Sequence, residues 1–329
     1  MRKLLFTAAA AIIAWAMLVV PLPLLALVPV AATPVADILE VVDDDAELAE
    51  PIPDSVRFTA VLVQPASAVG AIEVWFDEHR SLTFAPNVVP RGVDPDEFVD
   101  LQVRMFEESV RTAAAIGMRA AGADVTITGD GARIERTVPG TPAAGVLERG
   151  DVIVAVDSTP VRLASELAAD LSAREAGEEV ELTLRRGGEE VLEQVRIGQL
   201  PEGAGAGLGV LATTVDLVID TPVEVRPRAD AAVGGPSAGL LVALGLYEAT
   251  GEADLVGDRV VAGTGTIDTS ANVGPVDGIR EKVRGAELAG ADVFLVPATQ
   301  AHEARAAAPD GLEVVPVETL QDAIDALER

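Results

Sequence analysis

The spacing of hydrophobic and polar positions changes several times along the chain. Residues 4–32 contain no charged side chain, and a run of that length exceeds the roughly 20 residues that a helix needs to cross a bilayer. Residues 96–122 place apolar residues at three- and four-residue spacing, namely Phe106, Val110, Ala113, Ala114 and Gly117. That spacing predicts an amphipathic helix, which ends at the glycine in position 122.

Beyond this helix the pattern changes to short strands, and then to alternating strands and helices. Residues 125–156 contain brief alternating runs, a helix is predicted over residues 165–174, and a hairpin turns at Gly187. In residues 201–329 a buried helix follows residues 234–240, and a strand, a second helix and a further strand come after it. The two patterns predict a small β domain and an α/β domain.

The composition narrows the classes of function. The 329 residues carry a formal net charge of −29, and a surface of that sign repels phosphate backbones, which argues against a nucleic-acid partner. Without cysteine the chain has no disulfide framework, no thiolate nucleophile and no cysteine-ligated metal. We expect neither a metal nor a cofactor. Only two histidines, His79 and His302, and two lysines are present, so a catalytic base has few candidates.

The N-terminal segment predicts a membrane anchor over residues 1–36, with a single pass in the cell membrane. Arg2 and Lys3 precede the uncharged run and acidic residues follow it, so the positive-inside rule places the protein body on the extracytoplasmic side. A cleaved signal peptide is the alternative, with Val30 and Ala32 as the small residues before the cut. Three prolines are expected to kink or end the helix in its outer half: Pro21, Pro23 and Pro29.

A serine at the head of an apolar helix is the first candidate for chemistry. The segment GGPSAGL, residues 234–240, places Ser237 after a turn formed by Gly234, Gly235 and Pro236. A hydroxyl at a helix N-terminus lies beside unpaired N–H groups, which can hold an oxyanion. A serine in this place can equally cap the helix, so the segment alone leaves both interpretations open.

The candidate proton acceptor is Lys282. On a helix that begins at Ile279, Lys282 lies on the apolar side near Ala286, whereas Arg280 and Arg284 point to the opposite side. Burial penalises an ammonium group and lowers its pKa, so a neutral amine becomes available to take the proton of a serine. The alternative is a lysine whose charged head reaches water past the apolar surface.

The segment TPAAGVLERGDVIVAVDSTPV and the order of the short strands around it resemble the PDZ domains of bacterial envelope proteases. Such domains bind carboxyl-terminal peptides as an added strand, with the carboxylate held by backbone N–H groups. A PDZ-shaped spacer with a blocked groove is the alternative. The resemblance implies that GDGARI is the carboxylate loop, with the residues Gly129, Asp130, Gly131, Ala132, Arg133 and Ile134.

The segments GPSAGL and TGTIDTSANVGPVDGIREK together resemble the proteolytic domain of the Lon family of Ser–Lys peptidases. This resemblance implies that Ser237 is the nucleophile, that Lys282 is the general base and that Thr264 orients the lysine. It also implies that the glycine-serine turn supplies oxyanion N–H groups and that the chain assembles into a hexameric ring. With the anchor and the PDZ-like region, the whole chain resembles bacterial membrane-anchored PDZ–Lon-like proteases.

Three features depart from the usual Lon pattern. Val233 and Gly234 stand in place of a charged or polar pair, Arg280 in place of a lysine and Thr266 in place of a glutamate. These differences keep the dyad but put the substrate contacts in doubt. Because Lys282 is the only lysine beyond the anchor, the chain contains no Walker lysine, and we expect proteolysis without ATP hydrolysis by this chain.

The expected fold is an α/β (α+β) Lon-type proteolytic domain with an inserted PDZ-like β domain and an N-terminal transmembrane helix. A linker is expected over residues 37–54 and a first protease part over residues 55–122, because this part resembles the early strand and helix of Lon domains. The PDZ domain is expected over residues 123–200 and the catalytic part over residues 201–329. The expected function is that of an ATP-independent, membrane-anchored serine endopeptidase that captures protein tails through its PDZ domain.

Two other functions remain open. A Ser–His hydrolase would use His79 or His302, although neither histidine has a recognisable partner motif. A non-catalytic PDZ adaptor on a dead protease fold would bind protein tails without cleaving them. The presence of both Ser237 and Lys282 argues against the adaptor.

Overall fold

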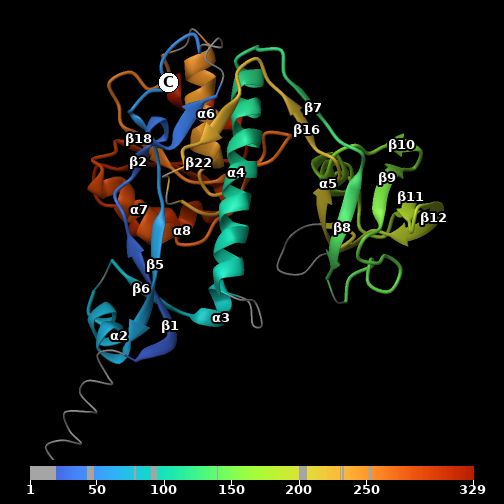
Figure 1. Cartoon of the computed structure of the whole chain (residues 1–329), viewed down its shortest axis with the longest axis horizontal. Coiled ribbons are helices and arrows are strands. Elements are labelled where there is room, and N and C mark those ends of the chain that lie inside the picture. Colours follow the sequence, from blue (N-terminus) through green and yellow to red (C-terminus); the bar gives the residue numbers. More distant parts are fainter. Residues whose placement is uncertain are drawn as a thin grey trace, which may run out of the picture. The chain divides into compact units, whose positions relative to one another are not determined.

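The chain divides into two compact units (Figure 1). One unit contains the described residues up to Ala123 together with Pro222–Arg329, and the other is Asp124–Thr221, which is inserted into the sequence of the first. Each unit is described by itself. The computed structural model describes residues 20–42, 48–77, 79–89, 95–138, 140–199, 206–229, 231, 233–251 and 254–329.

A five-stranded sheet with the order β2-β4-β18-β21-β22 lies in the first unit. Four of its strands are parallel, and the edge strand β2 pairs antiparallel with β4. All side chains of β18 and β21 are buried, as in parallel sheets that are covered on both faces. The strands are β2 (Thr33–Pro34), β4 (Val56–Phe58), β18 (Val261–Gly263), β21 (Val293–Pro297) and β22 (Glu313–Val317).

Two helices that lie far apart in the sequence, α4 (Pro95–Ala120) and α6 (Gly239–Thr250), pack against each other in this unit (Figure 1). The predicted helix over residues 96–122 is confirmed, with both ends within two residues. The two helix backbones approach closely at Gly117, where a Cβ atom would lie 2.1 Å from the carbonyl oxygen of Ala243. The contact joins the segments before and after the inserted unit.

The predicted anchor up to residue 36 is wrong in its second half. β1 (Pro21–Pro29) pairs antiparallel with β5 (Val61–Ser67) and β6 (Ser81–Phe84) in a three-stranded sheet, which α2 (Ala68–Trp75) and α3 (Ala85–Val88) accompany. Proline lacks the N–H that a helix interior needs and tolerates an extended backbone, so the proline-rich run forms a strand. Residues 1–19 of the predicted anchor lie outside the described residues. None of the helices formed by the described ranges combines the length and the hydrophobicity needed to cross a membrane.

The predicted linker over residues 37–54 also contributes to the first unit. η1 (Val35–Ile38) buries Val35 and Ile38, and β3 (Leu39–Val41) pairs with β17 (Val225–Pro227). These contacts belong to the same body as the sheet. The remaining elements of this unit are β19 (Thr266–Ile267), β20 (Val273–Gly274), α7 (Ile279–Leu288), η3 (Ala298–Gln300), α8 (Ala301–Ala307) and α9 (Leu320–Leu327).

The second unit contains a β sheet whose main path runs β12-β11-β9-β8-β15, and β10 also pairs with β9. The predicted hairpin is confirmed, since β11 and β12 pair along their whole length around Gly187, and α5 confirms the predicted helix over residues 165–174. The elements of this unit are β7 (Thr126–Thr128), β8 (Ala132–Thr137), β9 (Val152–Val156), β10 (Thr159–Pro160), α5 (Ala164–Ser172), β11 (Glu179–Arg186), β12 (Glu189–Arg196), β13 (Gly198–Gln199), β14 (Ala206–Gly207), β15 (Val210–Thr214) and β16 (Val218–Asp220).

The second unit extends to Thr221, beyond the predicted boundary at residue 200. The reason is strand pairing: β15 pairs antiparallel with β8, and β16 pairs with β7. Both strands therefore belong to the compact inserted unit.

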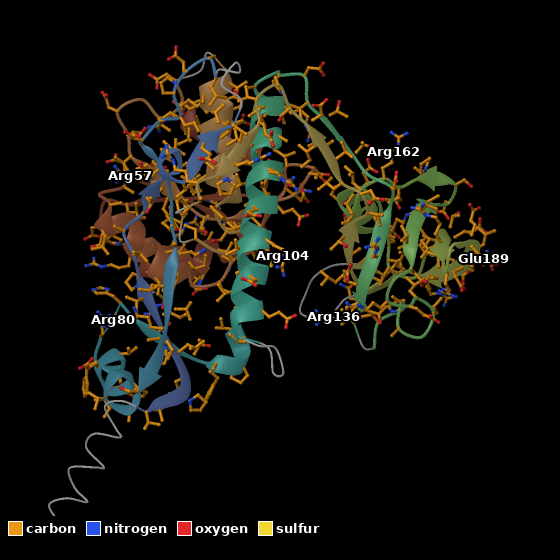
Figure 2. All side chains as sticks on the ribbon, in the orientation of Figure 1. Arg57, Arg80, Arg104, Arg136, Arg162 and Glu189 are labelled. Atoms are coloured by element: carbon orange, nitrogen blue, oxygen red, sulfur yellow. The ribbon has the colours of Figure 1, made fainter. Side chains whose placement is uncertain are left out.

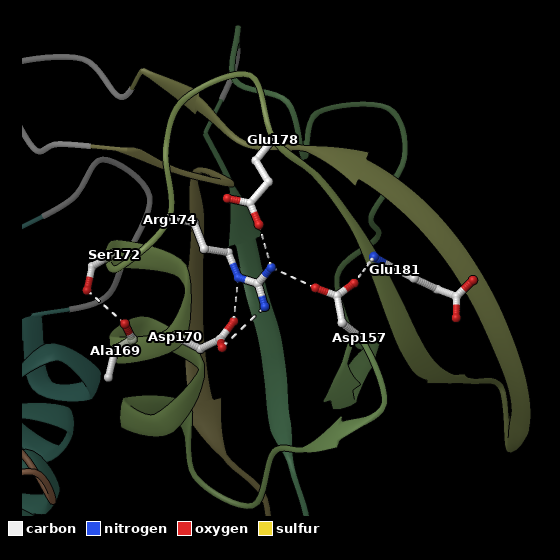
Figure 3. A network of polar contacts seen from close by, with 7 residues as sticks. All are labelled: Asp157, Ala169, Asp170, Ser172, Arg174, Glu178 and Glu181. Atoms are coloured by element: carbon white, nitrogen blue, oxygen red, sulfur yellow. Dashed lines mark hydrogen bonds and ion pairs between the residues drawn. The ribbon is translucent and has the colours of Figure 1, made fainter.

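An arginine-centred network holds the end of α5 to the sheet of the second unit (Figure 3). The guanidinium of Arg174 donates to Asp170 at 2.9 Å, to Glu178 at 2.8 Å and to Asp157 at 2.6 Å. Asp157 also accepts a hydrogen bond from the N–H of Glu181. This bond is the main reason that the pKa of the Asp157 carboxyl is lowered, and the hydrogen bond from Arg174 lowers it further. The network is expected to keep its charges throughout the neutral range.

Candidate active site and peptide-binding edge

Ser237 lies in a turn that α4 holds in place. Gly235 has a φ of +78°, a backbone conformation that favours glycine, and its N–H donates to the carbonyl of Gln102 at 2.9 Å. The hydroxyl of Ser109 donates to the carbonyl of Pro236 at 3.2 Å. The N-terminal segment that precedes the inserted unit thus positions the turn that carries the serine.

The capping interpretation of Ser237 does not fit this geometry. The residue that caps α6 is Ala238, and Ser237 stands one position before it. The side chain of Ser237 is half-buried, and among the described residues its hydroxyl makes no hydrogen bond. The hydroxyl is therefore not committed to the helix end.

The sheet holds the same turn from the other side. Thr264 directly follows the carboxyl end of β18, where ligands commonly bind in α/β folds. Its hydroxyl donates to the carbonyl of Ser237 at 3.1 Å, and the N–H of Gly265 donates to that carbonyl at 3.0 Å. In return, the N–H of Leu240 donates to the carbonyl of Gly265 at 3.0 Å. The backbone of the serine is therefore tied to the end of a buried strand.

Lys282 reaches this point from the first turn of α7. The residue is only 4% exposed, and its Nζ donates to Oγ1 of Thr264 at 2.9 Å. Burial lowers the pKa of Lys282 from 10.5 to about 8, partly opposed by the carboxylate of Asp277. The alternative of a lysine that extends into water is excluded by this burial.

One threonine hydroxyl thus contacts both candidate residues. Thr264 accepts from the amine of Lys282 and donates to the carbonyl of Ser237, so it fixes the lysine head beside the serine backbone. No direct hydrogen bond joins Ser237 to Lys282 among the described residues. Catalytic hydrogen bonds commonly form only when substrate is bound, so this arrangement is compatible with a Ser–Lys pair.

The predicted oxyanion donors of the turn are only partly available. Pro236 has no N–H, and the N–H of Gly235 is already bonded to Gln102. The N–H groups of Ser237 and Ala238, by contrast, have no partner among the described residues, and both lie at the start of a helix. The N–H of Ser237 belongs to the predicted glycine-serine turn, whereas that of Ala238 was not singled out in the sequence, although the first turn of a helix is where such groups occur.

The two histidines lie away from this arrangement of contacts. Both side chains are exposed, and neither forms a hydrogen bond with Ser237 in the described part of the chain. His302 lies in α8, and the N–H of His79 is bonded to Asp77. The structure therefore gives no support to a Ser–His pair.

The predicted carboxylate loop of the second unit is closed by the chain itself. The N–H of Asp130 donates to the carbonyl of Val215 at 2.8 Å, and that of Gly131 donates to the carbonyl of Arg162 at 3.0 Å. The strand that follows, β8, is paired on both edges, with β9 and with β15. In this structure the loop Gly129–Ile134 offers neither those two N–H groups nor an open strand edge to a peptide.

The open edge of this sheet belongs to β15. The sheet order ends at β15 in the described part of the chain, and α5 lies beside this strand. The N–H of Val215 donates to the carbonyl of Gly131 on the β8 side. Because successive residues of a strand direct their N–H groups to opposite sides, Ala212 and Thr214 direct theirs away from β8. No strand was predicted over these residues; the β-branched Val210, Thr213 and Thr214 are the sequence signal that favours one.

Comparisons with known proteins match two stretches of the chain. Residues 115–197 match the PDZ domain family, and residues 201–328 match the Lon protease (S16) C-terminal proteolytic domain. "Lon protease 2" of Bacillus subtilis (strain 168) is 29% identical over 120 residues, which are 36% of this chain and 20% of that protein. The chain therefore matches only about a fifth of the length of this curated relative.

Solved structures with a PDZ domain are similar to part of the chain. The PDZ domain of the SdrC-like protein of Listeria innocua is 22% identical and covers 25% of this chain and 93% of its own, with a TM-score of 0.24. The PDZ domain of the SdrC-like protein of Listeria monocytogenes is 20% identical and covers 25% of this chain and 87% of its own, with a TM-score of 0.24. The chain is a mixed α/β protein in which residues 115–197 match a PDZ domain and residues 201–328 match a Lon protease (S16) C-terminal proteolytic domain.

Proposed function

We propose that the chain is an ATP-independent serine endopeptidase in which Ser237 is the nucleophile and Lys282 is the general base. The observation that carries this proposal is the buried amine of Lys282 bonded to Thr264, which in turn is bonded to the carbonyl of Ser237. A lysine with a pKa of about 8 is a competent base near neutral pH. Lys282 is the only lysine beyond position 3, which leaves none for a Walker motif in this chain.

The reaction begins when the neutral amine of Lys282 takes the proton of the Ser237 hydroxyl. The serine oxygen attacks the peptide carbonyl, and the N–H groups of Ser237 and Ala238 stabilise the oxyanion that forms. The ammonium of Lys282 then gives its proton to the leaving amine, and the acyl group remains on the serine as an ester. Water, deprotonated by the same amine, hydrolyses the ester and restores both side chains.

A peptide-release assay on the full chain tests this assignment. Ser237→Ala and Lys282→Ala are expected to abolish cleavage while circular dichroism shows an intact fold, because nucleophile and base act as a unit. Lys282→Arg is expected to be nearly as inactive, since a guanidinium stays protonated. Robust turnover by the arginine variant would falsify the role of Lys282. Cleavage that is unchanged without ATP is the result expected for an ATP-independent enzyme.

The second unit is proposed to capture carboxyl-terminal protein tails at the open edge of β15. An added peptide strand would bond to the outward backbone groups of Ala212 and Thr214 and lie next to α5. Capture raises the local concentration of substrate for the protease unit. A peptide that ends in a free carboxylate is expected to bind more tightly than the same peptide with an amidated end.

Attachment to the cell membrane through the N-terminal segment completes the proposal. Since β1 takes residues 21–29 into a sheet, the uncharged run that remains for a membrane span is Leu4–Val20. Arg2 and Lys3 at its start support a cytoplasmic N-terminus and an extracytoplasmic body. Protease added to intact protoplasts is expected to digest the body, and the protein recovered from membranes is expected to keep its first residues.

A non-catalytic PDZ adaptor is the second candidate. It would need the same peptide edge on β15 but no reactive serine. An active-site probe that labels Ser237 in the native chain and not in Lys282→Ala separates the two functions, because an adaptor gains nothing from an activated hydroxyl.

A further inference from the structure

The helix that carries Lys282 starts without a side-chain cap. Gly278 is the N-cap residue of α7, with a φ of +71°, and a glycine has no side chain that could bond the first N–H groups. Lys282 lies in the first turn, where its N–H donates to the carbonyl of Gly278 at 3.0 Å. The position of the lysine backbone therefore depends on the contacts that hold this turn from outside.

One such contact is a hydrogen bond between Glu281 and the three-stranded sheet β5-β1-β6. Glu281 is only 4% exposed, and its Oε1 accepts from the hydroxyl of Ser81, the first residue of β6, at 2.5 Å. An O–H···O distance this short is typical of a bond to a carboxylate. Within the described ranges no other residue donates to the side chain of Glu281. The buried carboxylate therefore depends on Ser81.

The backbone that leads into Ser81 is itself held in a defined turn. Asp77 accepts the N–H of His79 at 2.9 Å and pairs with Arg80 at 3.1 Å, and Arg80 directly precedes Ser81 (Figure 2). On the other side, Ser81 pairs with Leu27 of β1. The hydroxyl that reaches Glu281 is thus fixed by a turn and by a strand.

The end of the sheet that carries Ser81 lies against α7 (Figure 1). Pro29, the last residue of β1, pairs with Val61, the first residue of β5, while Ser81 pairs with Leu27. Two residues along a strand span about 7 Å, so the three strand ends lie close together. The sheet therefore meets the helix with three strands at once.

Close approach of the backbones supports this contact at two glycines of α7. A Cβ at Gly285 would lie 2.3 Å from the carbonyl oxygen of Val30, and a Cβ at Gly278 would lie 2.9 Å from Cγ2 of Val61. The N–H of Ala32 also donates to the carbonyl of Gly285 at 2.9 Å. Positions 278, 281 and 285 are three and four residues apart, so the sheet contacts a single face of the helix.

We propose that Ser81 and Glu281 are positioning residues for the general base, because their hydrogen bond fixes the turn of α7 from which Lys282 reaches Thr264. The inference rests on the Ser–Lys function proposed above. Thr264 holds the amine of the lysine, whereas the bond between Ser81 and Glu281 holds the backbone that carries it. Proton transfer needs hydrogen-bond distance, and a misplacement of about 1 Å can lower a rate on the order of 100-fold.

Glu281 acts through the helix and not through its charge. Burial lowers the pKa of Lys282, and the carboxylate that partly opposes this is Asp277. A glutamine at position 281 keeps an oxygen that can accept from Ser81 but carries no charge. Glu281→Gln is therefore expected to keep most of the activity, whereas Glu281→Leu, of similar size but without an acceptor, is expected to lose it.

A peptide-release assay on the full chain tests the pair, with kcat expressed per folded molecule from circular dichroism. Ser81→Ala and Glu281→Leu are each expected to lower kcat about 10- to 100-fold. The bond orients the base and not the peptide, so KM is expected to stay near its native value. The double variant is expected to be no slower than Glu281→Leu alone, since both changes remove one bond. Ser81→Thr keeps the donor and is expected to keep most of the activity.

The pH profile of kcat/KM separates positioning from a loss of stability. A lysine that is held less firmly is more hydrated, so the apparent pKa of Lys282 in Ser81→Ala is expected to rise from about 8 toward 10.5. A variant that merely folds less well lowers the plateau and keeps the midpoint. Glu287→Leu is the matched control, because Glu287 lies on the same helix but pairs with Arg284. Its kcat and its midpoint are expected to be native.

Three results would overturn the positioning role: a native kcat and midpoint in Ser81→Ala, a loss confined to KM, or losses that multiply in the double variant. Lys282→Ala is measured in parallel to separate this inference from the proposed function. If Lys282→Ala still cleaves, the Ser–Lys function is refuted, and the positioning role with it. If Lys282→Ala is inactive while Ser81→Ala is fully active, only the positioning role is refuted.

Discussion

Replacing Lys282 by methionine is expected to abolish cleavage and to raise the free energy of unfolding near neutral pH. Methionine fills similar space beside Val283 and Ala286, both buried on the same face of α7, but carries no charge. Burial lowers the pKa of Lys282 from 10.5 to about 8. The difference, 10.5 − 8 = 2.5, corresponds to about 3 kcal/mol of unfavourable free energy for the buried ammonium.

The pH window of this effect follows from the two pKa values. Below pH 8 the lysine is protonated in the folded and in the unfolded chain, so the folded chain carries the whole penalty. Between pH 8 and 10.5 only the unfolded chain binds the proton, so the free energy of unfolding of the native chain rises with pH by about 3 kcal/mol in total. Methionine also loses the bond to Thr264, worth about 1.5–3 kcal/mol for a charged donor. At pH 7 the free energy of unfolding of the methionine variant is therefore expected to exceed that of the native chain by about 1 kcal/mol. By pH 10.5 the native chain is expected to be the more stable of the two.

Urea unfolding of the native chain and of Lys282→Met at pH 7 and pH 10 measures the difference in their free energy of unfolding. Arg280→Met is the control, because Arg280 is exposed on the same helix and its replacement should leave the pH dependence of the native chain unchanged. If the free energies of unfolding of the native and Lys282→Met chains differed by the same amount at both pH values, the lowered pKa would be refuted, and with it the role of Lys282 as base. Cleavage by the native chain should rise with pH through about 8 and then level off.

Three further changes test other parts of the structure. Thr264→Val removes the hydroxyl that positions the lysine. It is expected to lower kcat/KM about 10- to 100-fold in the peptide-release assay, since a bond to a charged group is worth about 1.5–3 kcal/mol. Thr264→Ser should keep most of the activity, whereas a valine variant as active as the native chain would contradict the positioning role. Gly117→Ala places a Cβ 2.1 Å from the carbonyl oxygen of Ala243 and is expected to lower the free energy of unfolding by about 1–3 kcal/mol or more, whereas Gly70→Ala, whose nearest atom would be 3.5 Å away, should not. Ala212→Pro removes an outward N–H from β15 and is expected to abolish tail binding in a fluorescence-anisotropy titration while cleavage of short peptides continues; unchanged tail binding would exclude this edge.

Local sequence determined the elements whose signal is periodic or carried by a single turn. The apolar stripe of residues 96–122 became α4, the glycine pair at Gly187 became a hairpin turn, and the apolar face of α7 buried Lys282 as its spacing predicts. These features depend on side chains one or two turns apart, so they can be recognised without knowing the rest of the fold. The identity of the proteolytic domain was likewise present in two short motifs.

Pairing between distant segments was decided only by the tertiary structure. Residues 21–29 have the hydrophobicity of a membrane helix, yet β5 and β6 offer them strand partners that lie 32 to 60 positions later. The same holds for β15, whose pairing with β8 extended the inserted unit and moved the open sheet edge away from Gly129–Ile134. Thr264 links lysine and serine only because β18 ends where α6 begins. Hydrogen bonds between strands are formed by backbone groups that nearly every residue has, so the local sequence does not determine which strands pair. The pairing is selected by the burial of side chains across the whole sheet.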